Sequence, residues 1–230
     1  TADDEGYAKL PETMKLLTEK LPEGSGEHFA FTHPVENINE GLKTAAQVDY
    51  VARCGSFRKS GLAYTGALKI LQVILSYDYL WLNIRVKGGA YGCMSGFGRS
   101  GEGYLVSYRD PNLKETNEIY EGIPEYLRQF NPDDRDMTKY VIGTISNMDT
   151  PLTPSVKGSR GLSAYLSGVT EEMMQKERDE VLTATKEDIR ALADIVQAVL
   201  DTGSFCVVGN EEKIEANREM FGSVESLSRA

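Results

Sequence analysis

Apolar positions along the chain recur mostly with the period of a helix. Over residues 7–21 the apolar side chains lie three or four residues apart, which predicts a short amphipathic helix with one apolar side: Leu10, Met14, Leu17 and Leu21. The next segment, residues 22–43, reads as an irregular connection that begins with proline and glycine. Residues 47–53 predict a strand. The chain is therefore expected to begin with a helix and a strand joined by a long connection.

A longer apolar run, residues 64–84, predicts a helix of about twenty residues. Its apolar residues cover more than one face, which is typical of a helix buried between a sheet and other helices. Arg85 and Lys87 stand in its last turn, where positive side chains interact favourably with the helix dipole. Gly88 and Gly89 follow directly and provide a natural C-cap.

The rest of the pattern predicts a hairpin, several helices and one more strand. Residues 91–97 and 104–108 are predicted strands, and the glycine-rich segment between them predicts a hairpin whose tip residue Arg99 faces solvent. Five helices are predicted next, at residues 110–130, 133–148, 155–167, 171–182 and 185–200. A strand at residues 205–208 follows, and a last helix begins at residue 211, after the cap residue Asn210.

This order of elements predicts the α+β class, with a mostly antiparallel sheet and helices packed on one face. Neither an internal repeat nor a low-complexity tract interrupts it. We therefore expect a single domain over residues 1–230. An N-terminal helix and connecting segment (1–44) would precede the α+β core (45–230).

Composition and charge narrow the class of protein. The 230 residues are 40% hydrophobic and 26% charged, which is ordinary globular composition. The formal net charge of −10 argues against nucleic acid as a partner and permits attraction of cationic peptides. The apolar stretches are too short to span a membrane, so no membrane partner is expected.

Cysteine and histidine are few. Cys54, Cys93 and Cys206 are odd in number and widely separated, which predicts three reduced, mostly buried thiols and favours an intracellular, cytoplasmic protein. His28 and His33 are interpreted as loop residues rather than zinc ligands. Because the chain begins with threonine rather than methionine, we expect it to be part of a longer protein.

Several kinds of catalytic site lack their signature. The chain has neither a G-x-S-x-G nucleophile elbow nor a phosphate-binding loop of the G-x-x-x-x-G-K-S/T type. Two loop histidines are poor partners for a serine or cysteine nucleophile. Acidic residues number 35, and no spacing selects two of them as a glycosidase-like pair.

The segment from Arg85 to Gly92, Arg-Val-Lys-Gly-Gly-Ala-Tyr-Gly, carries the clearest chemistry. Arginine is always charged and tyrosine is a neutral hydroxyl donor, so a converging pair suits a developing oxyanion or a peptide carbonyl. Six extended residues could separate Arg85 from Tyr91 by up to ~20 Å, so the chain must reverse at Gly88 and Gly89 for them to meet. The missing side chains of these glycines would also let a substrate backbone approach closely.

This segment, after Leu80 and Trp81 and before the hairpin, resembles the C-terminal half of a zinc metallopeptidase of the pitrilysin/insulinase family. It is most similar to the presequence-protease and falcilysin subgroup. The resemblance covers about residues 47–221 and includes the late blocks 185–189 and 207–214. It implies a metallopeptidase-half, processing-peptidase-like domain, one of two related halves that close around an unfolded peptide.

The resemblance also implies a division of labour. The zinc, its His-x-x-Glu-His motif and the general base would belong to the missing N-terminal half, which is the expected partner together with unfolded peptide substrates. This chain would bind no metal or cofactor, since residues 63–75 contain neither histidine nor glutamate. Arg85 and Tyr91 would be catalytic and would bind substrate, with Gly88 and Gly89 beside them.

The implied function is that of the non-zinc half of a zinc-dependent metalloendopeptidase that degrades oligopeptides in a closed chamber, inactive on its own. The alternative is a catalytically inert structural or interaction module of the same fold. A third possibility is an unrelated hydrolase that uses carboxylates. The peptide substrates and the oligomeric state are not indicated by the sequence.

Overall fold

The computed structural model describes residues 2–24 and 37–227. They fall into two compact units. The larger unit comprises residues 37–150 and 171 to the C-terminal end, and the smaller comprises residues 151–170 with the N-terminal segment up to residue 36. The single-domain expectation stays a prediction, and each unit is described by itself.

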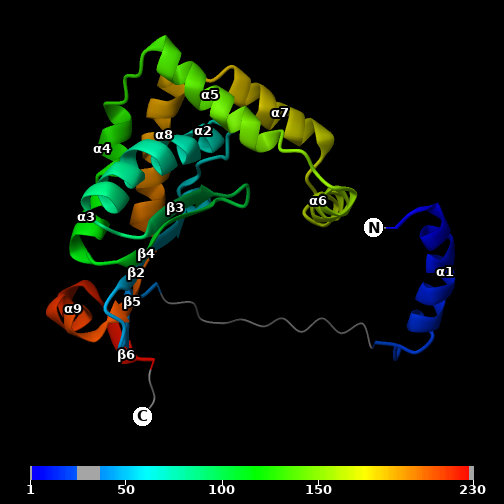
Figure 1. The fold of residues 1–230 in the computed structure, drawn as a ribbon, viewed down its shortest axis with the longest axis horizontal. Helices are drawn as coiled ribbons and strands as arrows, with labels where there is room; N and C mark the ends of the chain where they lie inside the picture. Colours follow the sequence, from blue (N-terminus) through cyan, green and yellow to red (C-terminus); the bar gives the residue numbers. More distant parts are fainter. Residues whose placement is uncertain (1, 25–36, 228–230) are drawn as a thin grey trace. The chain divides into compact units, whose positions relative to one another are not determined.

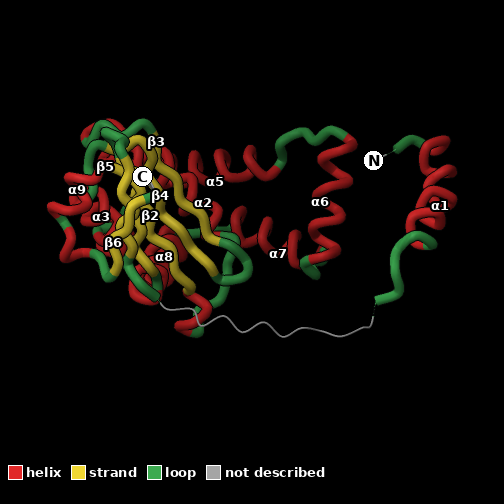
Figure 2. The backbone as a smooth tube through the Cα atoms, turned by 90° about the horizontal axis from the view of Figure 1, so that it is seen from below, coloured by secondary structure: helices red, strands yellow, loops and turns green. Residues whose placement is uncertain are grey.

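The larger unit is built on one six-stranded mixed sheet with the order β3-β4-β2-β5-β1-β6, whose strands lie side by side in Figure 2. The strands are β1 (Glu40–Thr44), β2 (Asp49–Ser56), β3 (Gly92–Phe97), β4 (Glu102–Asp110), β5 (Ser204–Asn210) and β6 (Ser223–Ser226). β2 is antiparallel to β4 and β5, and β3 is antiparallel to β4. β1 runs parallel to both β5 and β6. The sheet is therefore mostly antiparallel, as predicted.

This unit contains seven α-helices, and the long helix α8 lies along one face of the sheet (Figures 1 and 2). They are α2 (Ala67–Ile74), α3 (Lys114–Glu121), α4 (Ile123–Arg128), α5 (Asp134–Met148), α7 (Glu171–Leu182), α8 (Lys186–Thr202) and α9 (Glu211–Ala216). α2 and α8 pack on each other and on the sheet, with α8 against β2 and β4 and α2 against β3. The α+β class with helices on one face is confirmed.

The alternation of strand residues explains which face the helices cover. Val51, Leu105 and Val207 are fully buried and point to the helical side. Their neighbours Tyr50 and Tyr104 point to the other side and are exposed. Burying a side chain such as Val51 stabilises the fold by roughly 1.5–3 kcal/mol, so the helical face supplies most of the core.

Most predicted helices are confirmed within a few residues. The predicted cap is present at Asn210. Asp133 and Thr185 also cap their helices, and Thr185 forms a complete capping box with Asp188. The predicted helix over residues 110–130 is two helices, α3 and α4, separated at Gly122. A Cβ atom there would lie 2.5 Å from the hydroxyl oxygen of Tyr79, so the two helices are divided where this tyrosine packs.

Two strands, β1 and β6, were not predicted. β1 lies within the segment interpreted as an irregular connection. Only Gly41 of β1 is buried, and a Cβ atom there would lie 2.8 Å from the side chain of Ile214. β6 is a short polar edge strand with no buried residue. Neither strand has the alternating apolar residues from which a strand is predicted.

The smaller unit contains α1 (Asp4–Thr18) and α6 (Pro154–Leu166). Asp3 caps α1 by accepting a hydrogen bond from the backbone N–H of Gly6 at 2.8 Å. The predicted amphipathic helix is thus confirmed, but its apolar side chains are exposed in this structure. The predicted helix at residues 155–167 is also confirmed, and it too has no buried residue.

The expectation that Arg99 faces solvent is wrong. Its guanidinium lies 2.8 Å from a carboxylate oxygen of Glu177 in α7 and 5.4 Å from the ring centroid of Tyr64. The Tyr64 hydroxyl donates to the same carboxylate oxygen at 2.6 Å. The ion pair and the hydrogen bond together satisfy the buried Glu177, and the ion pair with Arg99 attaches the hairpin tip to α7.

The three cysteines are unpaired. The expectation of mostly buried thiols is wrong for Cys54, which is exposed on the sheet face that the helices leave open. Cys93 and Cys206 are half-buried. Burial raises the pKa of the Cys93 thiol to about 11; Asp110 raises it further and Arg85 opposes the shift. Burial also raises the pKa of the Cys206 thiol.

At pH 8, iodoacetamide is expected to modify Cys54 well before Cys93 or Cys206, because only the thiolate reacts and the buried thiols remain protonated. Mass spectrometry of peptides from timed samples measures the order. In a Cys54→Ser variant the fast phase should disappear. Modification of Cys93 at the rate of Cys54 would contradict the assigned burial.

Candidate functional site

The helix that carries Arg85 changes its winding before it ends. α2 continues into two π-helical segments, η2 (Leu75–Tyr79) and η3 (Trp81–Lys87), so the predicted long helix extends to residue 87. Leu80 and Ile84 remain fully buried, whereas Trp81 and Val86 are exposed. π-Helical turns are rare and occur frequently at functional sites, so this segment marks the helix end as unusual.

Gly88 and Gly89 end this helix and reverse the chain. The N–H of Gly88 donates to the carbonyl of Asn83 at 3.0 Å, and that of Ala90 donates to the carbonyl of Ile84 at 3.1 Å. Gly89 has φ +81°, a left-handed conformation that favours glycine. A Cβ atom at Gly88 would lie 2.6 Å from the carbonyl oxygen of Ile84. Both glycines are thus explained by the turn itself.

The turn brings Arg85 and Tyr91 together. The guanidinium carbon of Arg85 lies 5.9 Å from the ring centroid of Tyr91 and 5.8 Å from that of Trp81. The ring of Tyr108 meets Tyr91 edge to face at 5.5 Å. Tyr91 is 59% exposed and Trp81 is 45% exposed, so the cluster lies at the surface. Its position allows it to contact a molecule bound there.

Gly92, the first residue of β3, makes room for the ring of Tyr108. A Cβ atom at this position would lie 2.4 Å from a ring carbon of Tyr108. The glycine therefore allows Tyr108 to cross β3 and reach Tyr91. In the sequence this residue is indistinguishable from an ordinary turn glycine.

Arg109 is the residue that sequence reasoning missed. Its guanidinium carbon lies 5.5 Å from the ring centroid of Tyr91, and its carbonyl accepts a hydrogen bond from the Tyr91 N–H at 3.2 Å. Counting outward from the hairpin tip would have placed Arg109 opposite Tyr91, because the register pairs Gly92 with Tyr108. Hairpin register is thus a signal that could have found it.

The loop after Arg109 supports the turn before Tyr91. The side-chain amide of Asn112 donates to the carbonyl of Gly88 at 2.6 Å. Asp110 is fully buried and accepts hydrogen bonds from the Asn112 N–H at 2.9 Å and from the Thr116 hydroxyl at 2.8 Å. The buried Asp110 carboxylate therefore holds the loop in place, and Asn112 in that loop holds the carbonyl of Gly88.

Neither Arg85 nor Arg109 forms an ion pair or a side-chain hydrogen bond with another residue of the described chain. The described contacts of both guanidinium groups are with aromatic rings. The half-buried guanidinium of Arg85 and the exposed guanidinium of Arg109 lie beside one phenol. Both can donate hydrogen bonds to a carbonyl or a carboxylate, and the phenol can donate one as well. None of the three supplies a base or a nucleophile at neutral pH.

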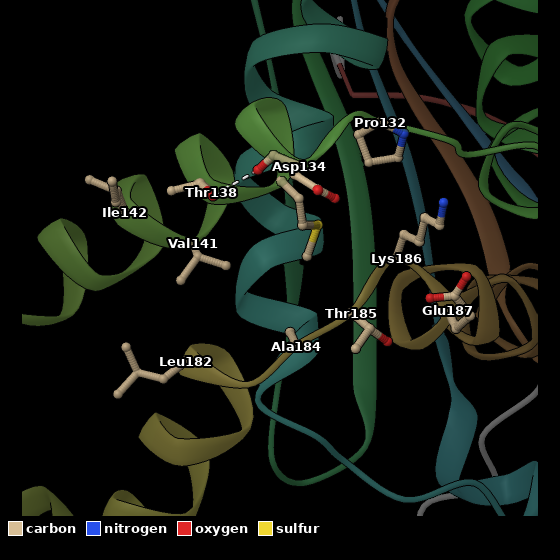
Figure 3. Close-up of a pocket in the computed structure, with 11 residues that line it drawn as sticks. Pro132, Asp134, Thr138, Val141, Ile142, Leu182, Ala184, Thr185, Lys186 and Glu187 are labelled. Carbon is tan, nitrogen blue, oxygen red and sulfur yellow. Dashed lines mark hydrogen bonds between the residues drawn. The ribbon is translucent and has the colours of Figure 1, made fainter.

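A separate cavity of about 520 Å³ lies between α5 and the α7–α8 connection (Figure 3). Val141, Ile142 and Leu182 give it an apolar side, and Lys186 and Glu187 lie at the start of α8 (Figure 3). Its lining includes no residue of the Arg85–Tyr91 cluster. The candidate site is therefore a surface cluster, not this cavity.

The described residues contain neither a cluster of metal-binding side chains nor a helix suited to cross a membrane. Across residues 2–24 and 37–227, no three histidine, cysteine, aspartate or glutamate side chains are grouped so that they could hold a metal ion. His28 and His33 lie outside the described residues. None of the described helices combines the length and apolar character that crossing a bilayer requires.

Comparison with known sequences gives a consistent result. The family model described as PreP C-terminal domain matches residues 39–211. The protein HypA of Clostridium perfringens is 44% identical over 224 residues, which are 97% of this chain and 23% of that protein. Presequence protease 1, chloroplastic/mitochondrial, of Arabidopsis thaliana is 34% identical over 218 residues, 94% of this chain and 20% of that protein. The chain thus spans less than a quarter of the length of these two relatives.

Solved structures share the fold at low sequence identity. A protease from Helicobacter pylori matches 87% of this chain and 52% of its own, with a TM-score of 0.62 and 14% identity. A peptidase M16 inactive domain from Pseudomonas fluorescens matches 89% of this chain and 51% of its own, with a TM-score of 0.60 and 15% identity. Pitrilysin matches 90% of this chain and 23% of its own, with a TM-score of 0.58 and 11% identity.

Replacement of Asp110 by alanine is expected to lower the free energy of unfolding by about 2 kcal/mol, because it leaves the Asn112 N–H and the Thr116 hydroxyl without their acceptor. Urea unfolding measures the loss. The matched control is Asp136→Ala, in the first turn of α5, which should change stability by less than about 0.5 kcal/mol. Equal stability of the two variants would contradict the role assigned to Asp110.

Proposed function

The chain belongs to the PreP C-terminal domain family. We propose that it lies in the C-terminal, non-zinc half of a zinc-dependent metalloendopeptidase that degrades oligopeptides in a closed chamber. The observation that carries the proposal is the contact between Arg85 and Tyr91 on an open surface. This pair can stabilise a transition state, but it supplies neither the nucleophile nor the base that the reaction needs. A site of that kind requires a second set of groups from another part of the polypeptide.

The residues of this chain would act on the peptide carbonyl. Attack on a peptide bond gives a tetrahedral oxyanion, and the Tyr91 hydroxyl would donate a hydrogen bond to it. Arg85 would hold a carbonyl or carboxylate of the bound peptide, since its guanidinium is always charged and has no acidic partner among the described residues. Gly88 and Gly89, which present no side chains, would let the peptide backbone approach the pair.

Zinc and the general base are assigned to the N-terminal half, outside this chain. Bound zinc supplies a nucleophilic water at neutral pH. The described residues offer no group of ligands for it, so no step at the metal is assigned to this chain. The expected partners are that N-terminal half and unfolded peptides. The net charge of −10 favours cationic peptides, and three unpaired cysteines support an intracellular location.

In the full-length polypeptide, Tyr91→Phe is expected to lower kcat roughly 100-fold, the loss typical for one oxyanion donor, with little effect on KM. Stability should be nearly unchanged, because the hydroxyl is at an exposed residue. Peptide hydrolysis and thermal unfolding measure the two effects. The control Tyr77→Phe, at another exposed tyrosine, should keep full activity. Full activity of Tyr91→Phe would favour the inert structural module instead.

The 230-residue chain alone is expected to show no peptidase activity and no stoichiometric zinc, and to become active when mixed with the polypeptide that precedes it in the full-length protein. A fluorogenic peptide and elemental analysis measure both. Activity or bound zinc in the isolated chain would contradict the division of labour. An N-terminal half that is fully active by itself would assign this chain the inert role.

A further inference from the structure

Arg109 lies at an irregularity of the sheet. The register of β2 with β4 shifts between Asp49 and Val51. At this bulge two residues of β4, Tyr108 and Arg109, oppose the single residue Tyr50. Bulges are frequent beside active sites, where they redirect a side chain. Here the redirected side chain is Arg109.

The backbone of Arg109 is in a conformation that arginine rarely adopts. Its φ is +48°, and it is the one residue other than glycine with positive φ in the described chain. Glycine or asparagine would tolerate this conformation better. An arginine here is therefore explained by its side chain and not by the backbone.

The Arg109 side chain is directed to Tyr91. Its guanidinium lies 5.5 Å from the ring centroid, within the range of a cation–π contact. The backbone of the same residue accepts the Tyr91 N–H, so Arg109 holds Tyr91 at two points. Arg85 provides a second cation at 5.9 Å from the same ring. The phenol is thus held by contacts from two separate segments of the chain.

The positive charge of Arg109 has no acidic partner in the described residues. Its neighbour Asp110 is the nearest carboxylate along the chain. That carboxylate is buried and bonded to the Asn112 N–H and the Thr116 hydroxyl, so it is turned away from the surface. Among the described residues, the Arg109 guanidinium contacts the ring of Tyr91.

We propose that Arg109 is a positioning residue for Tyr91. The β4 bulge directs its guanidinium onto the ring, and this contact orients the phenol hydroxyl for donation to the peptide oxyanion. This inference rests on the proposed function, in which the Tyr91 hydroxyl donates a hydrogen bond to the peptide oxyanion. Arg109 itself does not touch the reacting atoms.

Arg109→Gly separates the side chain from the backbone. Glycine fits φ +48° without strain and keeps the carbonyl that accepts the Tyr91 N–H, so the variant should fold with equal or greater thermal stability. In the full-length polypeptide its kcat should fall about fivefold or more while KM changes little, because the ring is no longer held in place. Arg109→Lys keeps a cation and should recover most of the loss.

Fluorine NMR tests the positioning without reference to turnover. With 3-fluorotyrosine placed only at position 91 of the full-length polypeptide, the resonance of the Arg109→Gly variant should shift and sharpen as the ring becomes mobile. The control Lys87→Ala removes a nearby exposed charge that is bonded to Asn83 and should leave both the resonance and kcat unchanged.

An unchanged resonance and unchanged kcat in folded Arg109→Gly would overturn the proposal. An equal loss of kcat in Lys87→Ala would also overturn it, because the loss would then follow from removing any nearby positive charge. A shifted resonance together with full activity of Tyr91→Phe would support the positioning role and reject the proposed function. The two ideas can therefore fail separately.

Discussion

Two carboxylates, Asp49 and Asp110, lie opposite each other at the ends of β2 and β4, and both are fully buried. Buried carboxylates must be hydrogen-bonded or paired, because leaving them without partners is costly. Asp49 accepts from the Asn210 N–H at 2.7 Å and from the ammonium of Lys213 at 3.2 Å. The ammonium of Lys213 also reaches the carbonyl of Pro111 at 2.8 Å. The hydrogen bonds that satisfy these two groups therefore connect three segments of the chain, at residues 49, 110–116 and 210–213, at one end of the sheet.

The geometry of the candidate site follows from this connection. The loop that satisfies Asp110 also presents Asn112 to the carbonyl of Gly88, where the long helix has just ended. From that turn the chain enters β3 at Tyr91, and the bulge in β4 brings Arg109 beside it. The surface cluster of two arginines and tyrosines thus depends on buried polar contacts beneath it. This arrangement agrees with a general design in which supporting residues hold the reacting ones in place.

Much of this fold could be predicted from apolar periodicity and caps. Asn210 was predicted as a cap because its side-chain oxygen precedes a helical pattern, and it accepts the backbone N–H of Lys213. β1 and β6 could not be predicted, since pairing in a mixed sheet depends on distant partners rather than on local alternation. Arg85 and Tyr91 were found because six residues of sequence join them. The hairpin register alone could have placed Arg109 opposite Tyr91. The positive φ of Arg109 and the direction of its side chain could not be predicted, because they arise at a bulge and a bulge leaves no local signature in the sequence.

The two π-helical segments have a consequence for how this helix can change in length. Each residue of an α-helix advances by about 100° around the axis. The wider turns of η2 and η3 advance by less, so the direction in which Arg85 leaves the helix depends on how many residues lie between it and the buried Ile74. Loss of one residue from this stretch would rotate Arg85 away from Tyr91 while the apolar composition of the helix stayed almost the same. The position of Arg85 beside Tyr91 therefore depends on the number of residues in this helix. A segment of the same composition but a different length would not keep the two side chains together.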